Sequence, residues 1–102
     1  MELKLDPESF EKQQEILVEE LINNIAVKVQ EAGLTGLEME NLTANIAFTV
    51  ASTIDDMTGI ESDGVHVHPY LTFRNEDDDL IHDGENSYTY EFVTPVLKRV
   101  FG

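Results

Sequence analysis

The chain has 102 residues, of which 21 are acidic and six are basic, giving a formal net charge of −15 at pH 7. Anionic lipids and nucleic-acid backbones repel such a surface, which argues against direct binding of either. The chain has no cysteine, which excludes disulfides and zinc–thiolate sites and suits a cytoplasmic location. With 41% hydrophobic residues, the sequence predicts one folded domain over residues 1–102.

The N-terminal region contains no secretion or membrane signal that we can recognise. The first residues lack the basic and apolar regions of a signal peptide. No apolar run approaches the roughly 18–20 residues that a membrane-spanning helix needs. We therefore expect a protein without a membrane partner.

A long amphipathic helix is predicted over residues 7–32. Asp6 is a suitable N-cap residue, Pro7 suits the first helical position, and Gly33 supplies a left-handed stop. Between these ends, apolar residues recur about every 3.6 residues and form one stripe. The stripe comprises Phe10, Leu17, Val18, Leu21, Ile22, Ile25, Val29 and Ala32.

A second helix is predicted over residues 36–58, and the short connection makes the two helices an antiparallel hairpin. Thr35 and Glu38 have capping-box spacing, and Gly59 would end the helix. The helix has no charged residue between Glu40 and Asp55. It carries two nearly opposite apolar stripes, a pattern typical of a helix that is covered on both sides. The stripes contain Met39, Leu42, Ile46, Val50, Ile54 and Met57 on one side, and Leu37, Ala44, Phe48 and Ala51 on the other.

The last part of the chain predicts a small antiparallel sheet. Val65 and Val67 alternate with His66 and His68, so we expect the valines to face the core and the histidines to face solvent. Asp83 followed by Gly84 favours a hairpin turn. The order of elements predicts an α+β fold in which the helix hairpin packs on an antiparallel meander. The predicted elements are strands at about 65–73, 80–82 and 87–93, followed by a short C-terminal helix at 95–101.

The pattern of exposed apolar residues predicts a homodimer built from the two long helices. Ile16 and Val27 interrupt the polar side of helix 7–32, and Phe48 belongs to the second stripe of helix 36–58. Two or three small strands and a short helix offer little material to cover both sides of that helix. The alternative is a monomer in which the sheet covers one side and the first helix covers the other.

Three histidines form the only candidate metal site in the sequence. His66 and His68 lie on one face of a predicted strand, and His82 could complete a site for zinc or another divalent ion. A solvent-facing strand is the simpler interpretation of the same residues. We therefore predict no bound metal and no cofactor.

An acidic loop is the other candidate for a binding surface. Asp77, Asp78 and Asp79 follow Glu76, and such a run is typically either a solvated loop or a docking surface for a basic protein. The spacing of these residues does not fit a calcium-binding EF-hand loop, because Ile81 would occupy a ligand position.

No pattern in the sequence indicates a catalytic reaction. The chain has neither a nucleophile elbow nor a glycine-rich phosphate loop, and we predict no catalytic residues. The first hypothesis is a non-enzymatic protein-interaction module that acts as a homodimer. One alternative is a small metal- or ligand-binding protein that uses His66 and His68. The other is a polyanion-mimicking inhibitor of a nucleic-acid-binding protein, in which aspartates replace phosphates.

Overall fold

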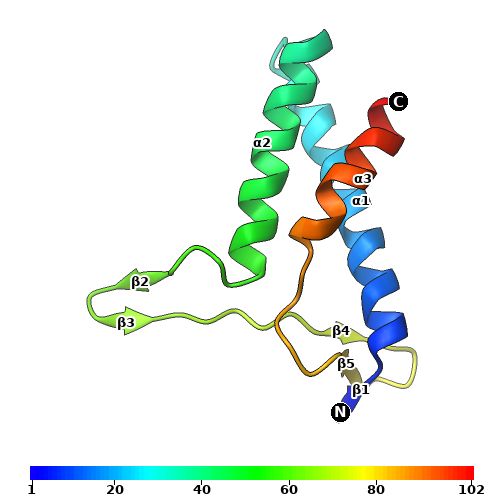
Figure 1. Ribbon diagram of the computed structural model, residues 1–102, viewed down its shortest axis with the longest axis vertical. Helices are drawn as coiled ribbons and strands as arrows, with labels where there is room; N and C mark the ends of the chain where they lie inside the picture. The colour runs from blue at the N-terminus through cyan, green and yellow to red at the C-terminus, as the bar shows by residue number, and fades with distance from the viewer.

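Three helices and five short strands make up the computed structural model, which describes residues 1–102 (Figure 1). The α+β class, the hairpin of two long helices and the short C-terminal helix are confirmed. The helices are α1 (Pro7–Glu31), α2 (Gly36–Ile54) and α3 (Tyr90–Phe101). The strands are β1 (Leu3–Leu5), β2 (Glu61–Ser62), β3 (Val65–His66), β4 (Phe73–Arg74) and β5 (Leu80–His82).

Helix α1 begins and ends as its cap residues predict. The Asp6 carboxylate accepts a hydrogen bond from the Ser9 N–H at 3.3 Å, which satisfies one of the free donors of the first turn. At the other end, Gly33 takes the left-handed conformation with a φ of 98°. The predicted range 7–32 therefore matches the observed helix to one residue.

Helix α2 ends at Ile54 and not at residue 58 as predicted. Asp56 follows the helix in the left-handed conformation, with a φ of 61°. The Met57 N–H then donates to the Ser52 carbonyl at 2.9 Å, a hydrogen bond of the Schellman motif that usually contains glycine. Aspartate tolerates the left-handed region better than most residues, so the helix stops before it reaches a glycine.

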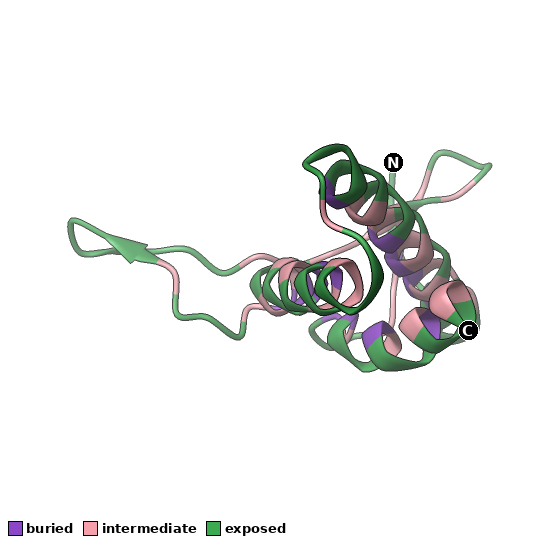
Figure 2. Ribbon diagram, turned by 90° about the horizontal axis from the view of Figure 1, so that it is seen from above, coloured by how far each residue is buried: buried purple, intermediate pink, exposed green.

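The main core lies among the three helices, and Figure 2 shows the buried residues on their facing sides. Helix α3 packs against both α1 and α2. It therefore covers the side of the hairpin that we expected the sheet to cover. The small alanines of α2 allow this close approach. The core consists of Val18 and Ile22 from α1, Ala47 and Ala51 from α2, and Val93 and Val96 from α3.

A three-stranded sheet lies at the N-terminal end of α1, with the strand order β1–β5–β4. Strand β5 confirms the predicted strand at 80–82, but it pairs with β1 in parallel and with β4 antiparallel, so the sheet is not a simple meander. Ile81 and Phe10 are buried at this end. The Phe10 ring lies 5.4 Å from the Phe73 ring and 6.4 Å from the Tyr88 ring. Burial raises the pKa of the Tyr88 hydroxyl, and the nearby acidic charges add to this effect.

The predicted strand at about 65–73 is wrong in extent. Only Val65–His66 and Phe73–Arg74 lie in strands, and Pro69 between them has no N–H to donate to a ladder. Val65 and Val67 were expected to face the core, yet they are 63% and 48% exposed. The reason is that this segment leaves the body of the protein (Figure 1).

The predicted strand at 87–93 is also wrong, because α3 begins at Tyr90. The helix expected at 95–101 is present, but it starts five residues earlier than predicted. The Asp55 carboxylate accepts hydrogen bonds from the N–H groups of Thr89 and Tyr90, so the start of the helix is stabilised from another element. The alternation of aromatic residues therefore gives way to a helical pattern. Its inward positions are Phe92, Val93, Val96, Leu97 and Val100.

The molecule exposes more surface than a compact monomer does. Its Cα radius of gyration is 15.3 Å, against about 13 Å for a compact domain of 100 residues. Its accessible surface is 6617 Å², whereas a compact 11.5 kDa monomer exposes about 5,800 Å². This difference comes from a projecting segment and from helix faces that the chain itself does not cover.

Candidate interaction surfaces

An apolar groove runs between α1 and α2, on a side of the hairpin that α3 leaves open. Its volume is about 450 Å³, and six of its eight lining residues are hydrophobic. Lys28 is the only charged residue among them. We call this surface the α1/α2 groove. It is lined by Leu21, Asn24, Ile25, Lys28, Val29 and Ala32 from α1, and by Leu42 and Ile46 from α2.

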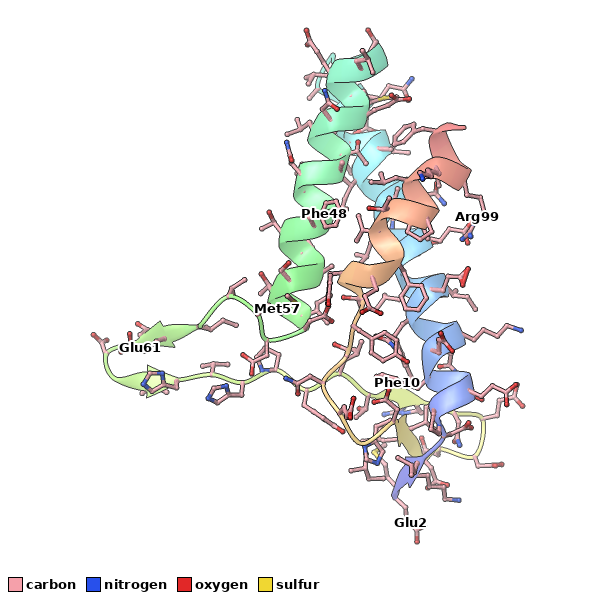
Figure 3. All side chains as sticks on the ribbon, in the orientation of Figure 1. Glu2, Phe10, Phe48, Met57, Glu61 and Arg99 are labelled. Atoms are coloured by element: carbon pink, nitrogen blue, oxygen red, sulfur yellow. The ribbon has the colours of Figure 1, made fainter.

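The second surface is a projecting hairpin, residues 57–69, which we call the arm. Strands β2 and β3 pair antiparallel within it, and both views show it pointing away from the helices (Figures 1 and 2). Met57 lies at its base and Glu61 near its far end (Figure 3). Asp63 and Gly64 form its turn, with φ values of 52° and 79°. A two-residue type I′ turn requires a positive φ at both of these positions.

The arm has one apolar face and one polar face. Ser62 pairs with Val65 and Glu61 pairs with His66, and the Val67 N–H donates to the Ile60 carbonyl at 3.0 Å. Because paired residues share a face and faces alternate along each strand, the largely apolar face carries Ile60, Val65 and Val67 together with the small polar Ser62. The other face carries Glu61 and His66.

One histidine contact holds the base of the arm, and a second lies just beyond it. The Nδ1 atom of His68 lies 2.9 Å from an Asp56 carboxylate oxygen, which joins the end of the arm to the residue that ends α2. Beyond the arm, the Tyr70 hydroxyl lies 2.7 Å from Nδ1 of His82. The Gly84 N–H donates to the same nitrogen at 3.2 Å, so Nδ1 is an acceptor and the Tyr70 hydroxyl donates to it.

The three histidines proposed for a metal site lie apart. His66 is on the polar face of the arm, His68 pairs with Asp56, and His82 bonds Tyr70 in another part of the fold. No group of three histidine or acidic side chains is placed to hold an ion. The geometry therefore gives no support to the metal-binding interpretation.

The apolar residues predicted for an interface are exposed, but they do not line the groove. Ile16 and Val27 are exposed on the side of α1 that points away from it. Phe48 is exposed on α2, about 200° around the helix axis from Ile46. Both apolar stripes of α2 thus keep exposed residues, since its best-buried positions lie between the stripes and at one small residue of the second stripe, Ala51. These positions are Thr43, Ala47 and Ala51.

The acidic loop is organised by its own residues. The Asn75 side chain accepts hydrogen bonds from the N–H groups of Asp77 and Asp79. The Asp79 carboxylate lies 2.8 Å from the Lys4 ammonium, and it accepts the Glu2 N–H at 2.9 Å. These two donors lower the pKa of Asp79 from its ordinary value of 3.8, and the same carboxylate raises the pKa of Lys4. Asp79 therefore serves to attach β1.

Asp78 also has an internal partner, since Arg74 lies 3.3 Å from its carboxylate. Asp77 remains exposed on this loop. Docking of a basic protein through Asp77, Asp78 and Asp79 stays a prediction, with two of the three carboxylates already paired within the chain.

Asp55 is a structural residue that the sequence analysis missed. Its carboxylate is 3% exposed and accepts four hydrogen bonds between 2.6 and 3.0 Å. The donors are the hydroxyls of Ser87 and Thr89 and the N–H groups of Thr89 and Tyr90. A charged residue directly after a long uncharged helix is the signal that could have singled it out.

Comparisons with protein-family models, with curated proteins and with solved structures find no match to this chain. No helix is both long enough and apolar enough to cross a bilayer.

Proposed function

We propose that the chain is a non-enzymatic protein-interaction module that acts as a cytoplasmic homodimer. The observation that carries the proposal is the large apolar surface on α2 and beside it. Leu42 and Ile46 line the α1/α2 groove together with Leu21, Ile25 and Val29 of α1. Contiguous exposed apolar surface of this kind marks interaction sites in soluble proteins.

The amount of exposed surface supports the same proposal. The chain exposes roughly 800 Å² more than a compact monomer of its mass. One partner buries about 800 Å² in a protein interface of standard size. Association of two copies would therefore bring the exposure per chain close to the value for a compact domain.

The acidic residues lie mostly outside the α1/α2 groove, so the high negative charge does not prevent self-association through it. Lys28 is the only ionic side chain that lines the α1/α2 groove, and α2 carries no charge between Glu40 and Asp55. Two copies that meet through these surfaces bury few charges, so desolvation costs little. The acidic residues elsewhere keep the dimer dispersed, and they offer a site for a basic partner.

The interface is tested by Leu42→Gln, which removes an apolar side chain from the groove without changing the net charge. Leu42 is 38% exposed in the single chain, and glutamine is a good helix former, so folding is retained. Association can cover only the 38% of Leu42 that is exposed in each of the two copies, so the loss is about 1–2 kcal/mol per dimer, and the dimer dissociation constant should rise about five- to thirtyfold. Sedimentation velocity over a dilution series measures it.

Leu37→Gln is the matched control, since it makes the same change in the same helix at a position that is 73% exposed and outside the groove. We expect its dissociation constant to stay within about twofold of the native value. An unchanged constant for Leu42→Gln together with a raised constant for Leu37→Gln would place the interface on the other stripe. If the native protein sediments as a single chain, the homodimer proposal is wrong.

A further inference from the structure

The arm and the α1/α2 groove are complementary, and we propose that in the homodimer the arm of each copy lies in the groove of the other. This inference rests on the proposed homodimer and adds the segment that fills the groove. It is carried by the structure of the arm, the size and charge of the groove, and the direction in which the arm points.

Apart from the His68–Asp56 contact at its base, the arm is a hairpin whose strands pair only with each other. An isolated two-stranded hairpin is at best marginally stable in water. Its apolar face nevertheless carries Val65 and Val67, which are largely exposed, and Met57 is exposed at its base. A defined hairpin with an uncovered apolar face is the form expected of a segment that adds to another surface.

The groove has the size and chemistry to receive that face. An apolar cavity of about 150 Å³ holds one benzene molecule, so the groove of about 450 Å³ has room for about three aliphatic side chains. The apolar face of the arm offers three, from Ile60, Val65 and Val67. Because both surfaces are apolar, their contact removes hydrocarbon from water on each side.

The groove edge carries both signs of charge, and the permanently charged residues of the arm are acidic. Lys28 borders the groove with its side chain largely exposed, at 3.3 Å from Glu31. The arm carries Glu61 and Asp63 and no Lys or Arg. An arm carboxylate near Lys28 would fix the register of the contact, which is the usual contribution of a charge at the rim of an interface.

The direction of the arm identifies a second copy as its partner. The arm leaves α2 beyond Ile54, whereas the groove contacts α2 at Leu42 and Ile46, about 12 Å or more back along the helix. The arm points outward from the helices (Figures 1 and 2). In a twofold dimer this arrangement makes the same contact twice, because each copy supplies one arm and one groove.

The absence of cysteine from the chain allows a direct test with the double variant Leu42→Cys/Val67→Cys, oxidised gently at a concentration where the dimer is populated. We expect a disulfide that joins position 42 of one chain to position 67 of the other. It would be seen as a covalent dimer on a non-reducing gel and assigned by peptide mass mapping. Leu37→Cys/Val67→Cys is the control, and its cross-linking should be at least tenfold slower.

Each other result overturns the inference in a distinguishable way. A disulfide closed within one chain would show that the arm folds back on its own groove. Equal cross-linking of the two double variants would show unspecific collision. A dimer by light scattering without the expected cross-link would leave the homodimer standing and remove the arm from its interface.

A second measurement guards against a disulfide that traps a rare encounter. Val65→Thr/Val67→Thr makes the apolar face polar while keeping β-branched side chains that suit a strand. We expect the dimer dissociation constant to rise at least tenfold. His66→Thr, on the polar face of the same arm, should leave it within about twofold, and an equal effect of the two changes would contradict the proposal.

Discussion

At the scale of single residues, Asp55 links the end of α2 to the start of α3. A buried carboxylate with four donors is stable because each hydrogen bond is strengthened by the negative charge. The donors come from Ser87, Thr89 and Tyr90, about 35 residues away in the sequence. This distance explains why local patterns around Tyr88 and Tyr90 predicted a strand, since the residue that favours the helix lies outside any local window.

Substitution of Asp55 by asparagine should destabilise the fold by about 2–3 kcal/mol. The amide oxygen can keep the three hydrogen bonds that Oδ1 accepts, but the amide NH2 group would face the Tyr90 N–H that donates to Oδ2, so this hydrogen bond and the negative charge are lost. Urea unfolding followed by circular dichroism measures the change. Asp77→Asn, on the exposed acidic loop, is the control and should change the free energy of unfolding by less than about 0.5 kcal/mol. Equal effects would contradict the role given to Asp55.

At the scale of elements, the ends of α1 could be predicted from the sequence and the end of α2 could not. The caps of α1 are local, as the bond from the Ser9 N–H to Asp6 shows. The end of α2 depends on Asp56 taking a conformation that glycine usually takes, so Gly59 gave a false boundary.

The arm shows a signal that was present in the sequence but was assigned elsewhere. The aspartate–glycine pair that forms a hairpin is Asp63 and Gly64, whereas Asp83 and Gly84 were predicted to form one. Both pairs suit a two-residue turn equally. Only the flanking chain decides between them, because β5 ends at His82 and its partners are β1 and β4.

Strand β1 was not predicted, and its attachment to β5 supplies a pH-dependent element. Lys4 and the Glu2 N–H lower the pKa of Asp79 below its ordinary value of 3.8. A lowered carboxyl pKa stabilises the folded state above the unfolded value, and this contribution is lost as the pH falls through the lower folded value. Between neutral pH and pH 5 the attachment of β1 should therefore stay constant, and it should weaken below about pH 4.

Asp79→Asn should remove this pH dependence and loosen β1 already at neutral pH. The Leu80 N–H, which donates to the Glu2 carbonyl at 2.7 Å, reports on the strand through hydrogen exchange measured by NMR. Asp78→Asn changes a neighbouring carboxylate that does not contact β1, and it should leave the exchange of this amide unchanged. Protection of Leu80 that is the same in both variants would contradict the account.

At the scale of the whole molecule, the candidate surfaces could be predicted only in part. The uncharged, two-sided pattern of α2 indicated that the helix needs cover on both sides. The structure shows α3 packing against Ala47 and Ala51 of α2, a packing that depended on the misassigned segment at 87–93. The arm was missed for a different reason. The alternation of valine and histidine is the same in a strand of a sheet and in a projecting hairpin.

The most direct test of the central claim is the mass of the native protein in solution, measured by light scattering after gel filtration over a range of micromolar concentrations. The homodimer proposal predicts a mass near twice 11.5 kDa that falls toward one chain on dilution. A mass of 11.5 kDa at every concentration would contradict it, because the α1/α2 groove would then remain in contact with water.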